Sequence, residues 1–201
     1  MNINLSIPYP YTELTGQCKN LRKILYSPNT PRDEFFDTVD KLYEIVRTIR
    51  TWYDNRQTEL KEKCNESVTD EEAKLYYQQL MELGSAEEFM SYATGLDDNS
   101  YCKPSYYSIL KFVNDDGYSR AATVYKAVKS IYNDAKSEEE INMLNDIMKG
   151  IKGMISLAYH HKRYCLDRRS LGVYTNSLFK RHWESFRQLG SCDYFIRQIL
   201  L

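Results

Sequence analysis

Glycine and proline are scarce in this chain of 201 residues, which contains 8 and 5 of them respectively. Because these residues punctuate turns, their scarcity argues against many short strands and favours a few long elements. No run of about 18 apolar residues occurs, so we expect no membrane-spanning helix. The first ten residues lack both a positive segment and an apolar core, so we expect no secretory signal peptide.

Cysteine is present, but not in the pattern of a disulfide-rich protein. The five cysteines are odd in number and widely spaced, which favours reduced thiols and a cytoplasmic location. CxxC and HExxH sequences are missing, and His161 and Cys165, with His182 and Cys192, do not have the close pairing of zinc ligands. Phosphate loops and nucleophile elbows are missing too. We therefore expect no metal, no cofactor and no enzymatic activity.

The composition that remains is that of an ordinary globular protein. Hydrophobic residues make up 42% of the chain and charged residues 27%, and the formal net charge is −1. Tyrosine is unusually frequent, with 18 residues. Tyrosine is enriched where proteins meet other molecules, although it also lines the rim of ordinary cores, and both interpretations stay open.

The strongest local pattern is a long amphipathic helix beginning at Thr30–Pro31. Thr30 is suited to the N-cap, Pro31 to the first helical position and Asp33 to the first turn. The spacing of its apolar residues predicts about 34 helical residues with a seam for a neighbouring helix. The polar segment 57–63 is expected to protrude into solvent. The predicted seam consists of Phe35, Val39, Leu42, Val46, Ile49 and Tyr53.

Capping signals and apolar periodicity predict further helices along the chain. One runs from Tyr11 to Tyr26, one is capped by Thr69, and one begins at a capping box at Ser85. After a polar stretch at 96–104, further helices are predicted at 106–113 and after a cap at Ser119, and a last one is centred on 178–186.

A second long helix is predicted after the capping box at Ser137. Its seam contains Leu144, Ile151 and Ile155, and it contains two glycines, Gly150 and Gly153. Each glycine costs about 1 kcal/mol relative to alanine inside a helix, so we expect either a closely packed neighbour or a bend there.

These elements predict an all-α bundle of about seven or eight helices with the two long amphipathic helices as its spine. We expect a single domain, 1–201, with a division into two lobes near 96–104 as the alternative. Leu42–Arg47 and Val124–Lys129 look alike, which raises the idea of a duplicated unit of about 80 residues; any two amphipathic helices share such patterns.

Charge is distributed unevenly along the chain. Residues 149–187 contain nine lysines and arginines but only Asp167 and Glu184 as acidic residues, and they hold all three histidines. Clustered basic residues with interleaved aromatics are typical of nucleic-acid interfaces, but also of a face that pairs with an acidic partner or with the protein's own acidic half. The candidate binding residues are Lys162, Arg163, Arg168, Arg169, Lys180, Arg181 and Arg187, with aromatic contacts from Tyr159, Tyr164 and Tyr174.

Taken together, the sequence favours a non-enzymatic helical interaction protein, a subunit, adaptor or inhibitor of a larger complex. It would dock a protein partner, or self-assemble, through helix faces and the basic C-terminal region. The alternative is a nucleic-acid-binding protein that uses the stretch 149–187. No membrane partner is expected.

Overall fold

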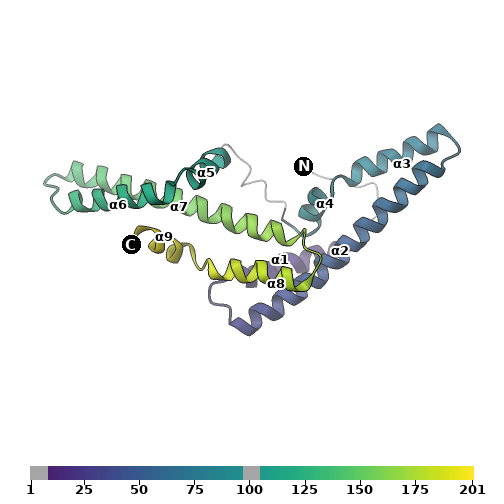
Figure 1. Ribbon diagram of the computed structural model, residues 1–201, viewed down its shortest axis with the longest axis horizontal. Helices are drawn as coiled ribbons and strands as arrows, with labels where there is room; N and C mark the ends of the chain where they lie inside the picture. Colours follow the sequence, from purple (N-terminus) through teal and green to yellow (C-terminus); the bar gives the residue numbers. More distant parts are fainter. Residues whose placement is uncertain (1–8, 97–104) are drawn as a thin grey trace. The chain divides into compact units, whose positions relative to one another are not determined.

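The computed structural model describes residues 9–96 and 105–201, and these residues form nine helices and no strand (Figure 1). The predicted all-α class is confirmed, with one or two helices more than predicted. The helices are α1 (Thr12–Tyr26), α2 (Arg32–Glu66), α3 (Asp70–Leu83), α4 (Ala86–Ala93), α5 (Ser105–Asn114), α6 (Gly117–Tyr132), α7 (Glu138–Ser170), α8 (Asn176–Gln188) and α9 (Cys192–Leu200). Within the described ranges, none of them is long and apolar enough to cross a membrane.

The chain divides into two compact units, each described here by itself. Unit 1 comprises Met1–Asp98 and Arg168–Glu184, and unit 2 comprises Asn99–Asp167 and Ser185–Leu201. The first boundary falls inside the stretch 96–104, where the sequence suggested a division. The other two boundaries fall within α7 and α8, so these helices contribute residues to both units.

Unit 1 is built on α2, which packs against α1, α3 and α4. Its predicted seam is confirmed, because every seam residue is at most 2% exposed. The Arg168–Glu184 segment completes this core: the rings of Phe179 and Tyr43 lie 5.3 Å apart, and those of Trp183 and Phe35 lie 6.5 Å apart.

Both ends of α2 differ in detail from the prediction. The helix begins at Arg32, with Pro31 as N-cap residue, while the hydroxyl of Thr30 donates to the carbonyl oxygen of Ile24 at 2.6 Å instead of capping. Segment 57–63 is not a free tip, because α3 packs back on α2 and buries Leu60 completely. The prediction of a protruding segment was wrong because it followed the polarity of the neighbouring residues. Leu60, the one apolar residue of the segment, is in the contact with α3.

The caps around the shorter helices largely follow the prediction. Thr69 caps α3, Ser85 forms the capping box of α4, and the amide of Glu140 donates to Ser137 Oγ at 3.2 Å at the start of α7. Ser119 was wrongly predicted as a cap, because α6 already begins at Gly117 after Asp116, whose φ is 56°. The left-handed conformation of Asp116 forms the turn before α6, so the helix begins at Gly117, two residues before the predicted cap.

Unit 2 has a smaller core, made by α5, α6, α7 and α9. Ala121, Ile155 and Leu200 are buried at its centre, and half-buried apolar side chains such as Tyr125 and Ile199 pack around them. The rings of Phe112 and Tyr118 meet edge to face at 5.3 Å.

The order and length of the helices repeat along the chain. The set α1–α4, with 15, 35, 14 and 8 residues, is followed by the set α6–α9, with 16, 33, 13 and 9 residues. From α2 and α7 onward, each helix of the second set begins 106 positions after its counterpart in the first. We call α1–α4 the first helical set and α6–α9 the second helical set.

Equivalent residues of the two sets make equivalent contacts. The hydroxyl of Tyr53 donates to the carbonyl oxygen of Gly84 at 2.7 Å, and that of Tyr159 donates to the carbonyl oxygen of Gly190 at 2.6 Å. Both glycines end a helix at positive φ, +67° and +71°, a conformation that favours glycine. Each tyrosine and glycine of the second set lies 106 positions after its counterpart.

The short last helices repeat as well. Phe89 of α4 packs its ring 5.1 Å from that of Tyr53, and Phe195 of α9 packs 5.5 Å from that of Tyr159. The repeat therefore relates α2 to α7. The resemblance of Leu42–Arg47 to Val124–Lys129 does not reflect it, because that pair relates α2 to α6.

Candidate functional site

The basic stretch that the sequence singled out is shared between the two units. Arg168, Arg169, Lys180 and Arg181, with Tyr174, belong to unit 1; Lys162, Arg163 and Arg187, with Tyr159 and Tyr164, belong to unit 2. Each group must therefore be judged by its own contacts.

In unit 1, two of these basic side chains pair with acidic residues of the same unit. Arg168 lies 2.6 Å from the Glu87 carboxylate, and Lys180 lies 2.8 Å from that of Asp40. These pairs join the Arg168–Glu184 segment to α4 and α2. They correspond to the interpretation in which the basic stretch neutralises the protein's own acidic half.

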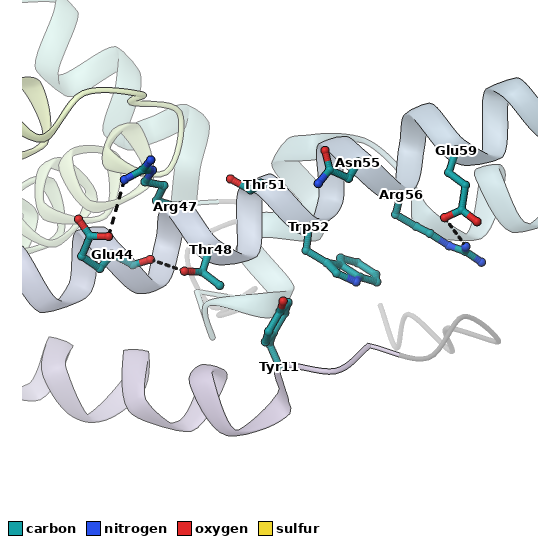
Figure 2. Close-up of a pocket in the computed structure, with 9 residues that line it drawn as sticks. All are labelled: Tyr11, Glu44, Arg47, Thr48, Thr51, Trp52, Asn55, Arg56 and Glu59. Atoms are coloured by element: carbon teal, nitrogen blue, oxygen red, sulfur yellow. Dashed lines mark hydrogen bonds and ion pairs between the residues drawn. The ribbon is translucent and has the colours of Figure 1, made fainter.

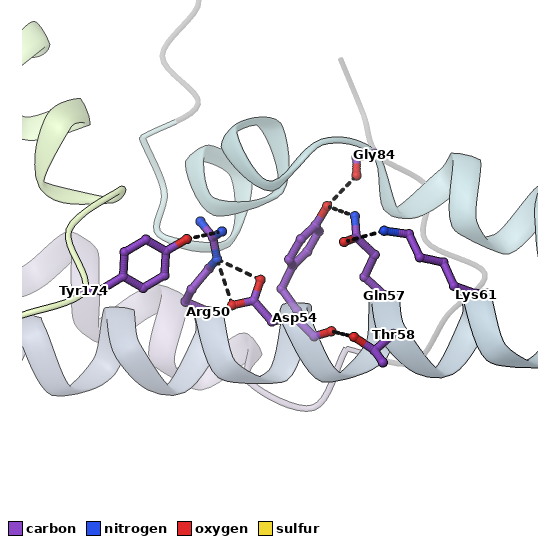
Figure 3. Close-up of polar contacts among 8 residues, drawn as sticks. Arg50, Asp54, Gln57, Thr58, Lys61, Gly84 and Tyr174 are labelled. Atoms are coloured by element: carbon purple, nitrogen blue, oxygen red, sulfur yellow. Dashed lines mark hydrogen bonds and ion pairs between the residues drawn. The ribbon is translucent and has the colours of Figure 1, made fainter.

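Tyr174 is held by polar contacts with α2 (Figure 3). Its hydroxyl accepts a hydrogen bond from Arg50 Nη2 at 2.6 Å, and its carbonyl oxygen accepts one from the Tyr43 hydroxyl at 3.0 Å. Arg50 also donates to Asp54 at 3.0 Å. Although Tyr174 is 68% exposed, it thus helps to hold the Arg168–Glu184 segment against α2.

In unit 2, the candidate aromatic residue Tyr159 is a core residue, only 1% exposed. The guanidinium of Arg163 lies over its ring and over that of Phe186, 5.4 and 4.6 Å from the two centroids. Lys162 lies 5.8 Å from the centroid of Phe195. Lys162 and Arg187 are exposed, whereas Tyr164 and Arg163 are half-buried.

The histidines and cysteines do not converge on one point. His161 Nε2 lies 3.5 Å from Cys165 Sγ, while the Cys192 thiol contacts Ser156 Oγ at 3.3 Å. Burial lowers the pKa of His161, and burial together with Arg169 and Arg181 lowers that of His182. In the part of the chain that the structure describes, no group of three or more His, Cys, Asp or Glu residues could hold a metal ion.

Unit 1 has an open pocket of about 480 Å³ between Tyr11 and α2 (Figure 2). Tyr11 and Trp52 form its aromatic wall, and Arg56 Nη1 lies 2.8 Å from the Glu59 carboxylate. Hydrogen bonds from Lys63 and Arg56 hold the pKa of Glu59 below its usual value. A carboxylate paired in this way stays ionised at neutral pH, so it is a poor general acid.

Unit 2 has a different kind of depression, a groove of about 600 Å³ along α6 and α7. Its floor and walls are mostly apolar. They include Ala121 and Val124 of α6 and Ile147, Gly150, Ile151 and Met154 of α7.

The groove continues into an exposed apolar row on α7, with residues spaced by four and three positions. Met143 is 57% exposed, Ile147 39% and Leu157 45%. We call this row, Met143, Ile147, Gly150, Met154 and Leu157, the outer strip of α7. Val124 and Ile131 of α6 are exposed as well. Exposed apolar residues gathered on one face of this kind typically mark an interaction site.

The equivalent row on α2 is polar. The residues 106 positions before the outer strip are all exposed, and they are Asp37, Lys41, Glu44, Thr48 and Thr51. The same place in the repeated architecture is therefore charged in the first helical set and apolar or small in the second. Compared with its counterpart on α2, the outer strip of α7 is unusually apolar.

The glycines of α7 are not explained by packing against any residue that the structure describes. A Cβ added at Gly150 or at Gly153 would meet no heavy atom within 4 Å, and α7 continues as one helix through both. A close neighbour from the described residues, one of the two predicted alternatives, is thus not found.

Sequence reasoning missed the outer strip because it assigned the apolar residues of α7 to a single seam. The available signal was that Met143, Ile147 and Leu157 lie off the row of Leu144, Ile151 and Ile155, so the helix is apolar on two faces.

The chain matches no family model, no curated protein and no solved structure. Its function must therefore be inferred from the surface itself.

Proposed function

We propose that this chain is a non-enzymatic helical interaction protein, a subunit, adaptor or inhibitor, that docks a protein helix on the outer strip of α7. The observation that supports the proposal is the replacement of a charged row on α2 by an apolar row on the equivalent face of α7. Helix-in-groove recognition uses apolar anchors spaced by three and four residues, which is the spacing of this strip.

The contacts of the basic residues favour a protein partner over nucleic acid. Within unit 1, Arg168 and Lys180 already pair with Glu87 and Asp40. Exposed Lys162 of unit 2 can add attraction for an acidic partner, which would raise the association rate more than the affinity.

The test uses a variant in which residues of the outer strip are replaced by their counterparts from α2. Each substitution copies the residue that α2 carries at the equivalent position, and the outer-strip variant combines Met143→Asp, Ile147→Lys, Met154→Thr and Leu157→Thr. We expect the wild-type chain to retain a protein partner, another protein or a second copy, in a quantitative pull-down, and the outer-strip variant to lose it. Equal retention by both would contradict the proposal.

A matched control is an equally drastic change at an exposed apolar residue elsewhere. Met81 of α3 is 64% exposed, and Met81→Asp should leave partner retention unchanged.

Nucleic-acid binding is measured separately, with labelled DNA and RNA at two salt concentrations. We expect no binding that weakens steeply with salt. If such binding is observed and is lost in the double variant Lys162→Ala/Arg187→Ala, the result supports nucleic-acid binding as the function and contradicts the protein-docking proposal.

A further inference from the structure

We infer that the outer strip of α7 is covered by a second copy of this chain, with two α7 helices crossing in antiparallel orientation and Gly150 at the two-fold axis. The inference rests on the proposed function, since it names the protein that occupies the docking surface. Three features of α7 support it: the equal distance of the two ends of the strip from Gly150, the distribution of acidic residues along the helix, and the central glycine.

The two ends of the strip are equidistant from Gly150. Met143 and Leu157 lie seven positions before and after it, and both are about half exposed. A two-fold axis at Gly150 places Met143 of one copy beside Leu157 of the other, and the reverse, so that the apolar ends of the strip cover each other. Self-complementarity of this kind is what a two-fold interface requires.

The distribution of acidic residues along α7 fits the same operation. Residues 138–149 carry four acidic side chains and one lysine, whereas residues 151–162 carry two lysines and no acidic side chain. An antiparallel crossing lays the acidic half of each helix against a half of its partner that carries no acidic side chain; Lys152 and Lys162 themselves lie over the rings of Tyr125 and Phe195 of their own unit. A parallel pair would place like charges together, which disfavours that orientation.

Gly150 explains how closely the helices can approach. It is exposed in the groove, and its missing side chain leaves open space toward solvent rather than toward the chain itself. Glycine at a crossing point lets two backbones come close, and the distance between packed helices depends on the side chains at the contact. Val124 of α6 lies beside this crossing point and adds apolar contact.

The first experiment is light scattering after size exclusion over a range of protein concentrations. We expect the wild-type chain to reach twice its monomer mass of 23.8 kDa, and the outer-strip variant to remain monomeric with an unchanged helical circular dichroism spectrum. Should that variant misfold, Gly150→Leu replaces it, because a Cβ there meets no heavy atom within 4 Å in the monomer, whereas the leucine side chain separates the two helices of the dimer.

The second experiment tests the axis and the orientation. Under mild oxidation with diamide, Gly150→Cys should form a disulfide-linked dimer, since two cysteines at a two-fold axis bring their Cα atoms within the range of about 7 Å that a disulfide tolerates. Lys149→Cys, on another face of α7, and the wild type report the background from the native cysteines. A short bismaleimide should join Met143→Cys to Leu157→Cys when these two variants are mixed, and join neither to itself.

The outcomes separate this inference from the proposed function. A wild-type chain that is monomeric at all concentrations overturns the inference; if the outer strip then still retains another protein, the proposed function stands. A dimer that the outer-strip variant preserves overturns the inference, and equal retention of another protein by the wild type and the variant overturns the proposed function as well. Cross-linking of Met143→Cys to itself overturns the antiparallel arrangement.

Discussion

The helices α2 and α7 occupy the same place in two successive helical sets, yet they present opposite chemistry to solvent. Both bury a tyrosine whose hydroxyl donates to a helix-ending glycine 31 residues further along. On the outer face, α2 shows Asp37, Lys41 and Glu44, whereas α7 shows Met143, Ile147 and Gly150. The difference shows that the repeat preserves the contacts that hold each set together, while the residue types on its outer face differ between the two sets.

The contact of the Arg168–Glu184 segment with α2 shows a second difference. In unit 1, Phe35 and Val39 are buried and the Trp183 ring packs near Phe35; the positions equivalent to Val39 and Tyr43 in the second set are Asn145 and Lys149, which are polar. At these two positions α7 is more polar than α2, whereas on the outer strip, which lies on another face of the same helix, α7 is more apolar than α2.

The largest expected effect contrasts a buried with an exposed leucine. Leu42→Ala in α2 should lower the free energy of unfolding by about 2–5 kcal/mol, because it leaves a cavity at a fully buried site. Leu157→Ala, at a 45% exposed site in α7, should cost no more than about 0.5 kcal/mol in the monomer. Urea denaturation followed by circular dichroism measures both. Equal losses would show that the outer strip is core, not surface.

The repeated tyrosine contact gives the next effect. Tyr53→Phe and Tyr159→Phe each remove a donor from a glycine carbonyl, and each should lower stability by about 1–2 kcal/mol. Tyr194→Phe, at an exposed tyrosine, is the control and should change little. If only one of the two variants is less stable, the contact has the same geometry in both sets but contributes differently to the free energy of unfolding.

Gly150→Leu should have opposite effects on folding and on association. In dilute monomer it should raise stability by up to about 0.8 kcal/mol, because leucine is a better helix former and the site is open. At high concentration it should abolish dimerisation. Gly16→Leu in α1, where an added Cβ also meets nothing, should raise stability without affecting assembly, and thermal melts at two concentrations distinguish the two responses.

The smallest effect concerns pH. Burial lowers the pKa of His161 below the ordinary value of 6.5, so the unfolded chain binds its proton more readily than the folded chain. Its contribution to stability is complete above pH 6.5 and is lost as the pH falls toward the folded-state pKa. His161→Asn, which copies Asn55 of the first set, should flatten the stability profile between about pH 7 and 5. The free energy of unfolding is measured by urea titration at each pH. If it falls with pH as steeply in the variant as in the wild type, other groups cause the pH dependence.

Much of the fold could be predicted from local sequence. The seam of α2, the caps at Thr69 and Ser85 and the capping box at Ser137 all depend on residues within one or two turns, where periodicity and backbone hydrogen bonding act directly. The outer strip and the burial of Leu60 could not be predicted in the same way. Which apolar face of a helix is covered depends on neighbours distant in the sequence.

The sequence by itself determined that this protein is all-helical, where its two long helices run and which face of α2 is buried, because each of these follows from spacing along the chain. Only the tertiary structure decided that the basic stretch is divided between two units, that Arg168 and Lys180 meet acidic partners, and that α7 keeps an apolar face open. The physical reason is that burial and ion pairing are properties of surfaces brought together by the fold, and local periodicity specifies the surfaces but not their partners.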